Sequence, residues 1–232
     1  MPSRLTPARR RGVEILDDPA TPADIRERSM ANVVRSNVLF GGTRAAVRAL
    51  RGILPQLPND TTLIDIGTGF ADIPAAAKGI ARNAGVTVAA FGLDVSEVVL
   101  RKALGVLNGA VLGDALRLPF RDGSFDVVTC SQLLHHFADD DARLLIRELH
   151  RVSRGWVIIL DLRRSWIAAA AFWIASVLFW FDPVTRHDGT ASVLRGFTAG
   201  ELETLVRETT SVKPRVEHGP FWRLSATWTK SR

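Results

Sequence analysis

The sequence of 232 residues contains no tyrosine and a single cysteine, Cys130. Without a second cysteine, neither an intrachain disulfide nor a cysteine zinc cluster can form. Cys130 ends an apolar run, where burial as a small hydrophobic side chain is expected rather than a role as nucleophile. The absence of tyrosine excludes the Tyr-Lys pair with which short-chain dehydrogenases relay protons, which argues against an oxidoreductase of that class.

Lysine is scarce too, since only four of the 30 basic residues are lysines and the rest are arginines. The formal net charge of +6 suits nucleic acid, an anionic membrane surface or an ordinary solvated surface. Because the arginines are interspersed with acids, we favour a solvated surface and expect no nucleic-acid partner. Apolar residues make up 47% of the chain, which excludes global disorder and allows a large core.

The first part of the chain predicts an arm followed by helices. Residues 1–20 are rich in proline, arginine and polar groups and predict a flexible arm. No apolar stretch of a secretory signal precedes Asp17, so we expect a cytoplasmic protein. Residues 21–58 predict an N-terminal helical cap, in which Thr21 is the N-cap of a first helix and Pro55 ends a second. The expected apolar face of the first helix contains Ile25, Met30, Val33, Val34 and Leu39.

The most informative segment is an apolar run from Leu63 to Ile66 that leads into Gly67 and Gly69. Glycine tolerates positive φ and lacks a Cβ, so the backbone can turn sharply and approach a ligand as the next helix starts. A dinucleotide fingerprint places a third small residue three positions further on, where this chain has Asp72. A carboxylate repels a pyrophosphate but tolerates a cationic ligand such as a sulfonium or an ammonium.

Three further apolar runs follow at the spacing of βαβ units. Residues 86–93 lead into Asp94, an acid at a strand tip that can accept hydrogen bonds from both hydroxyls of a ribose. Residues 110–112 lead through Gly113 into Asp114 and Ala115. The run 127–131 ends beside Gln132. The series is much more specific than the glycine turn alone.

Residues from about 60 to 162 resemble the nucleotide-binding core of class I S-adenosylmethionine-dependent methyltransferases. The resemblance implies an α/β fold with a doubly wound, seven-stranded, mostly parallel, Rossmann-like sheet, N-terminal helices and an apolar cap helix. It implies a methyltransferase domain over 59–232 with a lid insertion at 163–197, and S-adenosylmethionine as cofactor. In that family the glycine turn carries the methionine portion, the acid after the second strand holds the ribose, and an Asp-Ala pair meets adenine. The corresponding positions are Asp65, Gly67, Thr68, Gly69, Asp94, Val95, Asp114, Ala115 and Gln132.

For several other positions, the sequence indicates a structural role or leaves two roles open. Asp72 stands where many family members carry glycine and is expected to cap the following helix. In related methyltransferases the N-terminal helices close over the cofactor, so Ser36, Asn37, Phe40 and Arg44 either line its pocket or simply pack. Asp161 ends a predicted fifth strand and, as a lone acid, is expected to accept hydrogen bonds rather than bind a metal, and we predict no metal.

The segment Trp166 to Phe181 carries no charged residue. As a helix its sixteen residues would span about 24 Å at 1.5 Å per residue, short of the ~30 Å hydrocarbon core of a bilayer. We therefore predict one helix over the mouth of the substrate site, with Trp166, Trp173 and Trp180 as an aromatic stripe. A fully buried helix and a membrane-facing patch remain alternatives, and peripheral membrane contact stays open.

The remaining chemistry concerns the methyl acceptor. A phenol with a pKa of ~10 benefits from a general base near neutrality, a task that suits histidine. His187 is the first candidate, because it precedes Asp188 in a predicted polar turn after the apolar helix. His136, after the fourth strand, is the second candidate, and it equally suits a structural hydrogen bond.

The acceptor class is inferred from a weaker resemblance. Residues 130–133 replace the Asn/Asp-Pro-Pro-aromatic tetrapeptide of amino-methylating nucleic-acid enzymes, which disfavours base N-methylation. Residues 37–42 and 187–198 are similar to methyltransferases that accompany type III polyketide synthases and to quinone-biosynthesis enzymes. This implies O-methylation of an apolar phenolic or polyketide-like small molecule. A C-methyltransferase on a quinol-type ring and a non-catalytic cofactor-binding partner protein remain alternatives, and the oligomeric state is open.

Overall fold

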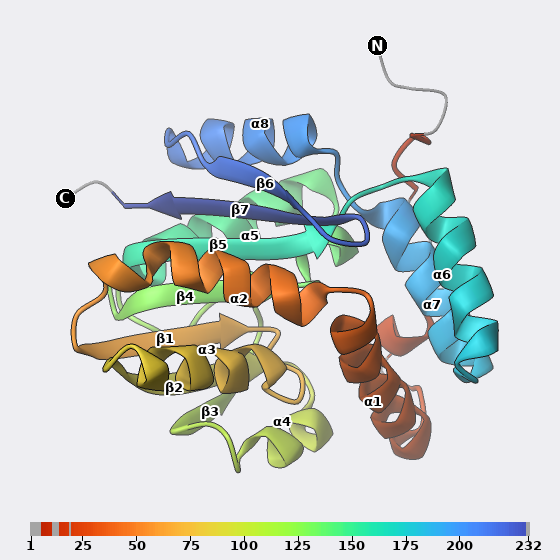
Figure 1. Cartoon of the computed structure of the whole chain (residues 1–232), viewed down its shortest axis with the longest axis horizontal. Helices are drawn as coiled ribbons and strands as arrows, with labels where there is room; N and C mark the ends of the chain where they lie inside the picture. Colours follow the sequence, from red (N-terminus) through yellow and green to blue (C-terminus); the bar gives the residue numbers. More distant parts are fainter. Residues whose placement is uncertain (1–5, 11–13, 19, 231–232) are drawn as a thin grey trace.

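The computed structural model describes residues 6–10, 14–18 and 20–230. Its centre is a seven-stranded sheet with the strand order β3-β2-β1-β4-β5-β7-β6 (Figure 1). The strands are β1 (Asp60–Ile66), β2 (Thr87–Asp94), β3 (Gly109–Leu112), β4 (Phe125–Ser131), β5 (Ser153–Leu162), β6 (Arg215–Gly219) and β7 (Arg223–Thr229). The predicted doubly wound, mostly parallel α/β sheet is confirmed.

Strands β1 to β5 pair in parallel, whereas β7 runs antiparallel to both β5 and β6. The strand order reverses at β1, because the chain first moves outward through β2 and β3 and then returns to the other side of β1 as β4. Connections diverge at such a switch point, and α/β proteins bind ligands in the crevice that this leaves at the carboxyl ends of the strands. The topology therefore directs attention to the ends of β1 and β4.

Helices cover both faces of the sheet and its carboxyl edge (Figure 1). The α-helices are α1 (Ala23–Leu39), α2 (Gly42–Ile53), α3 (Asp72–Asn83), α4 (Glu97–Ala103), α5 (Asp139–Val152), α6 (Trp166–Leu178), α7 (Pro183–Arg195) and α8 (Ala199–Thr210), and the 3-10 turns are η1 (Ile15–Asp17), η2 (Leu54–Gln56) and η3 (Leu134–His136). α2 and α3 pack on one face against Leu63 and Ile158, and α5 and α8 pack on the other against Ile64 and Val157. Neighbouring residues of one strand thus serve opposite cores, which explains why the central strands are apolar without interruption.

A second group of helices stands beyond the carboxyl ends of the strands. α6 and α7 lie side by side there, around a small apolar core that includes Ala168, Ala169 and Leu194 (Figure 1). α1 contacts α2, α4 and α7, so it connects the sheet body with the α6–α7 pair. These helices occupy the positions of the predicted helical cap and lid insertion, and the predicted domain boundaries stay predictions.

The prediction for the buried face of α1 holds only in part, because Ile25, Met30, Val33 and Val34 are half-buried. Leu39 of the expected apolar face is exposed, and the buried positions of the helix are polar. They are Ser29, Asn32, Ser36 and Asn37. α1 faces polar groups of the cap and the sheet edge, because Asn32 Nδ2 donates to Asp182 at 2.7 Å and Asn37 Nδ2 donates to Asp72 at 3.2 Å. Hydrogen bonds of buried polar side chains therefore help to orient this helix.

The expected start of α1 also differs. Thr21 does not cap the helix, since its hydroxyl donates to the Ile15 carbonyl at 2.6 Å and α1 begins at Ala23 without a side-chain cap. Within the predicted flexible arm, the described residues contact the body. Arg9 donates to the Arg195 carbonyl at 2.8 Å, and the Ile15 amide donates to Asp188 at 2.9 Å. Hydrogen bonds to α7 hold these residues in place. The amino-acid composition of the segment does not predict these hydrogen bonds.

The apolar segment after β5 is not a single helix to Phe181, and its large aromatic residues are mostly outside the core. α6 ends at Leu178, and Trp180 adopts a φ of +55° with 91% of its surface exposed. Trp166 and Trp173 are also exposed, which excludes the fully buried alternative. Among the residues that the structure describes, no helix is both long and apolar enough to cross a membrane.

The predicted polar turn at residues 186–189 is wrong, because these residues lie inside α7. The reason is a strong helix start: Pro183 occupies the first turn, and the Asp182 side chain accepts from the Thr185 amide at 3.0 Å. Other expectations are confirmed. Cys130 is buried, and burial raises the pKa of its thiol well above the ordinary value. The apolar patterns of residues 212–216 and 221–229 predict two closing strands, and both strands form, starting three and two residues later.

Thr198, followed three residues later by Glu201, predicts a capping box at the start of α8, and this box is present. The Glu201 amide donates to the Thr198 hydroxyl at 3.2 Å, and the Thr198 amide donates to the Glu201 carboxylate at 2.8 Å. We expect Thr198→Ala to lower the free energy of unfolding by about 1 kcal/mol, the usual cost of an N-cap. Urea denaturation measures it. Thr209→Ala on the same helix removes only a bond to the Leu205 carbonyl and should change stability much less.

Candidate active site

The glycine turn after β1 has the predicted conformation. Gly67 and Gly69 have φ values of +71° and +55°, which favour glycine. A Cβ on Gly67 would lie 2.9 Å from the Leu133 side chain, so the turn also needs a residue without one. The amides of Gly67 and Thr68 both donate to the Leu93 carbonyl, at 2.8 and 3.0 Å. The turn is thereby tied to the end of β2.

Asp94 at the end of β2 joins the same site. One carboxylate oxygen accepts from the Gly69 amide at 3.0 Å and the other from the Ser96 amide at 3.0 Å. Each oxygen keeps a lone pair for a further donor. Burial raises the pKa of Asp94, although the hydrogen bonds from Ser96 and Gly69 oppose the shift. The beginning of the next loop adjoins it, since the Gly113 amide donates to the Asp94 carbonyl at 3.0 Å.

The remaining predicted residues of this edge are more open. Asp114 is exposed and accepts from the Leu116 amide at 2.9 Å, which shapes the loop after β3. Ala115 is half-buried beside it, and Val95 is exposed next to Asp94. The turn, Asp94 and the Asp114 loop therefore follow one another along the carboxyl edge in the order β1, β2, β3.

Asp65 is buried near the end of β1, just before the glycine turn. It is 1% exposed and accepts from the Thr129 hydroxyl at 2.6 Å. Burial raises the pKa of Asp65 to about 7, the Thr129 hydrogen bond opposes the shift, and the charges of Asp72 and Asp94 add to it. The Asp65 carboxyl is thus only partly ionised near neutral pH.

A chain of polar side chains ties α1 to the switch point. Asn37 donates to Asp72, Gln132 donates in turn to the Asn37 side-chain oxygen, and Arg223 Nη1 donates to Gln132 at 2.5 Å. Asp72 is therefore anchored by Asn37, and its side chain is not the expected helix cap. Burial lowers the pKa of Arg223 to about 10. The backbone of Phe40 accepts a further bond from Arg223 at 3.2 Å.

This edge fits a cationic nucleoside. The Asp94 carboxylate can still accept hydrogen bonds from two hydroxyls. Buried carboxylates that repel each other are relieved by a bound cation, whereas a pyrophosphate would increase the repulsion. The residues present thus suit a ribosyl group with a sulfonium better than a dinucleotide.

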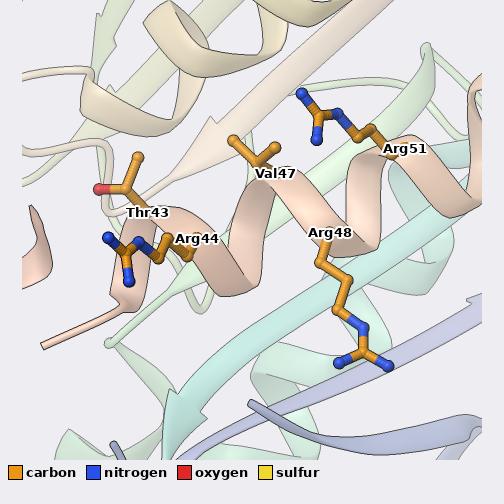
Figure 2. A pocket seen from close by; sticks show the side chains of 5 residues that line it. All are labelled: Thr43, Arg44, Val47, Arg48 and Arg51. Carbon is orange, nitrogen blue, oxygen red and sulfur yellow. The ribbon is translucent and has the colours of Figure 1, made fainter. Parts of the chain in front are cut away.

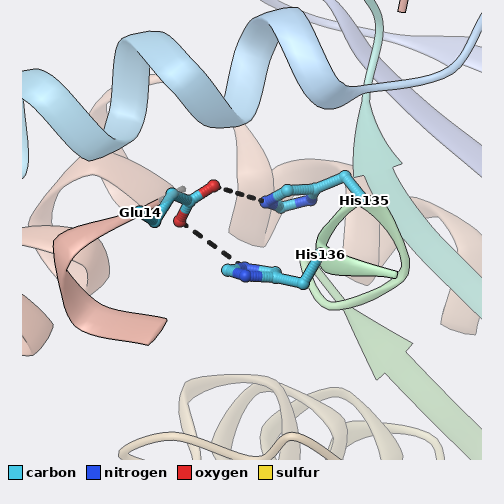
Figure 3. Close-up of side chains that lie close together, drawn as sticks. All are labelled: Glu14, His135 and His136. Atoms are coloured by element: carbon cyan, nitrogen blue, oxygen red, sulfur yellow. Dashed lines mark ion pairs between the residues drawn. The ribbon is translucent and has the colours of Figure 1, made fainter. Parts of the chain in front are cut away.

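A second cluster lies at η3 and was only partly anticipated (Figure 3). His135 Nδ1 lies 2.7 Å from the Asp161 carboxylate, which also accepts from the His135 amide at 3.0 Å. The predicted role of Asp161 as a hydrogen-bond acceptor is confirmed. Burial would raise the pKa of Asp161, but the charge and hydrogen bond of His135 outweigh it and hold that pKa below its ordinary value.

Glu14 of the N-terminal segment faces both histidines (Figure 3). Its two carboxylate oxygens lie 3.8 Å from His135 Nε2 and 3.7 Å from His136 Nε2. Arg195 Nη1 approaches Glu14 to 3.1 Å, and the Ser192 hydroxyl donates to it at 2.8 Å. Two histidines and a carboxylate with atoms within 4.8 Å of one another also have the make-up of a metal-binding group. The Arg195 charge on the carboxylate favours a proton-handling cluster over a cation site.

His187, the first candidate base, lies elsewhere. It is on α7 with its side chain 56% exposed, and its Nδ1 lies 2.8 Å from Asp188. Asp188 is itself buried and accepts the amides of Ile15 and Leu16, both at 2.9 Å. The pair therefore secures η1 against α7. No contact that the structure records among described residues joins His187 to the glycine turn or to His136.

A shallow hollow on the outer surface follows α2 and is unrelated to the predicted cofactor residues. Figure 2 shows that its lining side chains project from one helix. They are Thr43, Arg44, Val47, Arg48 and Arg51. Arg44, an expected pocket residue, is exposed on this surface. A smaller hollow at the switch point is bordered by Gln132, Asp161 and Arg223, between the two polar groups described above.

Sequence reasoning missed Glu14, Arg195 and Arg223. Glu14 stands in a segment without periodicity, and Arg195 and Arg223 are arginines among many. Only Arg223 carried a signal, because it interrupts the apolar beginning of a closing strand. All three are buried, and buried charges are paired or hydrogen-bonded, so their importance follows from burial that the sequence does not display.

The Asp65 carboxyl generates a pH prediction. Its pKa of about 7 in the folded protein exceeds that of the unfolded chain, so the folded state binds more protons and loses stability as pH rises from about 4 to about 7. Asp65→Asn should remove up to about 4 kcal/mol of this decline, at about 1.4 kcal/mol per pKa unit. Urea titrations at several pH values measure it. Asp60→Asn, at the exposed start of the same strand, should leave the decline intact, and an equal decline in both variants would contradict the prediction.

Comparison with known proteins agrees with this geometry. The family model of a methyltransferase domain matches residues 64–159. The ubiquinone/menaquinone biosynthesis C-methyltransferase UbiE of Paraburkholderia phymatum is 29% identical over 139 residues, 56% of this chain and 55% of that protein. The UbiE protein of Burkholderia orbicola is 33% identical over 112 residues, 45% and 44% of the two chains. The chain spans about half the length of the curated relatives it matches.

Solved structures share the fold over nearly the whole chain. The plantazolicin methyltransferase BpumL, solved in complex with SAH, has a TM-score of 0.69 at 15% identity and covers 92% of each chain. Magnesium protoporphyrin IX methyltransferase from Synechocystis PCC 6803, solved with bound SAM, has a TM-score of 0.61 at 13% identity and covers 94% of this chain and 95% of that one. Residues 64–159 thus match the family model of a methyltransferase domain, and the chain has the fold of methyltransferases whose structures were solved with SAH or SAM.

Proposed function

We propose that the chain binds S-adenosylmethionine and methylates a hydroxyl group of an apolar phenolic or polyketide-like small molecule. The observation that carries the acceptor class is the pair His135 and His136 bracketed by Asp161 and Glu14 beside the carboxyl edge of the sheet. A histidine supported by carboxylates is suited to remove a proton from a phenol near neutral pH.

The residues that would hold the cofactor are those of the glycine turn, Asp94 and the Asp114 loop. Asp94 would accept the ribose hydroxyls, and the backbone at Gly67 and Gly69 would adjoin the methionine portion. When bound, the cofactor supplies an electrophilic methyl group on a sulfonium. α1 stands over this edge, since the Met30 methyl group would lie 3.2 Å from a Cβ on Gly69. The chain itself contributes positioning and exclusion of water.

His136 is the better candidate base of the two predicted histidines. Its side chain is 24% exposed, so an acceptor hydroxyl can reach the ring, whereas Glu14 is buried beside it. The Glu14 carboxylate faces the His136 ring at 3.7 Å. Asp161 fixes His135, whose ring centroid lies 4.3 Å from that of His136, and so restrains the position of the neighbouring ring. Arg195 holds Glu14 in place.

Methylation of a ring carbon is the second candidate, and the names of the UbiE relatives favour it. A deprotonated phenol or quinol is nucleophilic at oxygen and at the adjacent ring carbons. The same base therefore serves both outcomes, and carbon methylation additionally requires loss of the ring proton. Mass and NMR analysis of products from alkylated phenols and quinols separates an ether from a ring methyl group.

The cofactor assignment leads to a binding prediction. Asp94→Asn should weaken S-adenosylhomocysteine binding by about 1–3 kcal/mol, because hydroxyl donors of the ligand and the Gly69 amide lose their charged acceptor. Isothermal calorimetry measures the change. Asp140→Asn, which alters a fully exposed carboxylate on α5, should bind as the wild type does. Unchanged affinity in Asp94→Asn would show that the ribose lies elsewhere.

The assignment of the base leads to a kinetic prediction. His136→Gln should lower turnover of a phenolic acceptor by about 10²- to 10⁴-fold, the usual contribution of a general base, without weakening S-adenosylhomocysteine binding. The acidic limb of the wild-type pH profile should be lost in this variant. His187→Gln is the matched control and should retain turnover, because His187 is exposed on α7. The opposite result would transfer the role to His187, and full turnover in both variants would exclude histidine as the base.

A further inference from the structure

The outer side of α6 is an apolar surface without a covering element in the described part of the chain. The helix carries no charged residue, and its exposed large side chains run from its first to its last turn and into the turn before α7. They are Trp166, Ile167, Trp173, Ile174, Val177, Leu178, Phe179 and Trp180. We call these residues the α6 surface. Contiguous apolar exposure of this kind marks an interaction site.

Two aromatic residues at or beside this surface are held in a strained backbone conformation. Trp180 has a φ of +55° with 91% exposure, and Phe221, in the β6–β7 loop, has a φ of +49° with 52% exposure. Bulky side chains rarely adopt the left-handed region, and such strain clusters at functional sites. Neither exposure nor strain helps the folded protein in water. Their joint occurrence indicates that these side chains serve contact with something outside the chain.

Phe40 lies between the end of α6 and the β6–β7 loop and joins their aromatic residues into one surface. Its ring centroid lies 6.3 Å from that of Phe179 at the end of α6 and 6.4 Å from that of Phe221. It also packs edge-on against Phe172 of α6 at 5.6 Å. The end of α6 and the β6–β7 loop, far apart in sequence, therefore present aromatic side chains on one side of the molecule. The α6–α7 pair stands apart from the sheet body in Figure 1, as such a role requires.

Arginines lie near both ends of the α6 surface. The Arg10 guanidinium lies 4.8 Å from the Trp166 ring centroid, and Arg35 lies 5.4 Å from that of Phe181, next to the helix end. Arg163, just before α6, is half-buried and contacts His218 at 3.3 Å. None of these three arginines forms an ion pair with a residue in the described ranges. Asp182, the first acidic residue after α6, already accepts hydrogen bonds from the side chains of Asn32 and Thr185.

We propose that the α6 surface, with Phe221, docks on an anionic lipid bilayer, with α6 lying in the interface rather than crossing it. Tryptophan and phenylalanine prefer this region, where their rings insert at the level of the headgroups. These arginines would contact anionic headgroups, which attract basic side chains at the membrane surface. A second copy is the poorer occupant, because a twofold contact would place the arginines of both copies together. The proposal does not depend on the methyl acceptor.

Vesicle flotation tests the proposal with the full chain. Wild type should float with phosphatidylcholine vesicles containing phosphatidylglycerol and much less with phosphatidylcholine alone. The double variant Leu178→Ser, Trp180→Gly should partition at least about tenfold less, since burial of one large apolar side chain is worth at least that factor. Glycine at position 180 relieves the positive φ, so its melting temperature should not fall. Leu104→Ser, which alters an exposed leucine after α4, is the control and should float as the wild type does.

Three outcomes would overturn the proposal. Wild type that does not float with anionic vesicles excludes lipid as the occupant. Flotation that the double variant retains assigns binding to another surface. A wild-type dimer in light scattering that the double variant converts to a monomer, without flotation of either, makes a second copy the occupant. S-adenosylhomocysteine binding, measured in parallel on all variants, separates failure of this proposal from failure of the proposed function.

Discussion

Desolvation of carboxylates at one edge of a parallel sheet is the constraint on which the rest of this structure depends. Asp65 and Asp72 flank the glycine turn, Asp94 lies beside it at the end of β2, and burial raises the pKa of each. Backbone amides, the Thr129 hydroxyl and Asn37 stabilise their charged forms in part. A fold that concentrates negative charge in this way favours a cationic nucleoside and disfavours a pyrophosphate. The same constraint explains why α1 turns a polar face toward the sheet.

The residues around the candidate base come from segments that are distant in sequence. Glu14 comes from the N-terminal segment, the two histidines from η3, Asp161 from β5 and Arg195 from α7. Each buried charge has a partner of opposite sign or a hydrogen bond, which is the condition for keeping it away from water. Arg195 also donates to the His136 carbonyl at 2.7 Å, so it restrains the backbone of η3 as well as Glu14. The position of the two histidines therefore depends on contacts with α7.

The cap helices α7 and α6 make different kinds of contact. α7 faces the N-terminal segment and α1 through buried polar contacts, among them those of Asp188 and Thr185. α6 turns apolar side chains outward and contributes small residues such as Ala168 and Ala169 to the core of the pair. Small inward residues allow close packing of α6 on α7, and the large residues are left for the outside. A helix with low amphipathicity can thus be surface-exposed when its inner side needs little volume.

Much of the fold follows from the sequence alone, because strands and their tips carry local signals. Apolar runs of suitable length, the glycines at 67 and 69 and the acids at 94 and 114 identified the sheet, the glycine turn and the order of residues along its edge. The capping box at Thr198 was equally local, since three residues suffice to define it.

Only the tertiary structure decided which charges are buried and which faces meet. Leu39 and Trp180 belong to apolar patterns but are exposed, whereas Asn37 and Arg223 are buried by partners remote in sequence. His187 and His136 are chemically identical in the sequence. Their difference arises because the fold leaves the first on the outer side of α7 and places the second against Glu14. Periodicity reports one chain segment at a time, and burial depends on what other segments cover it.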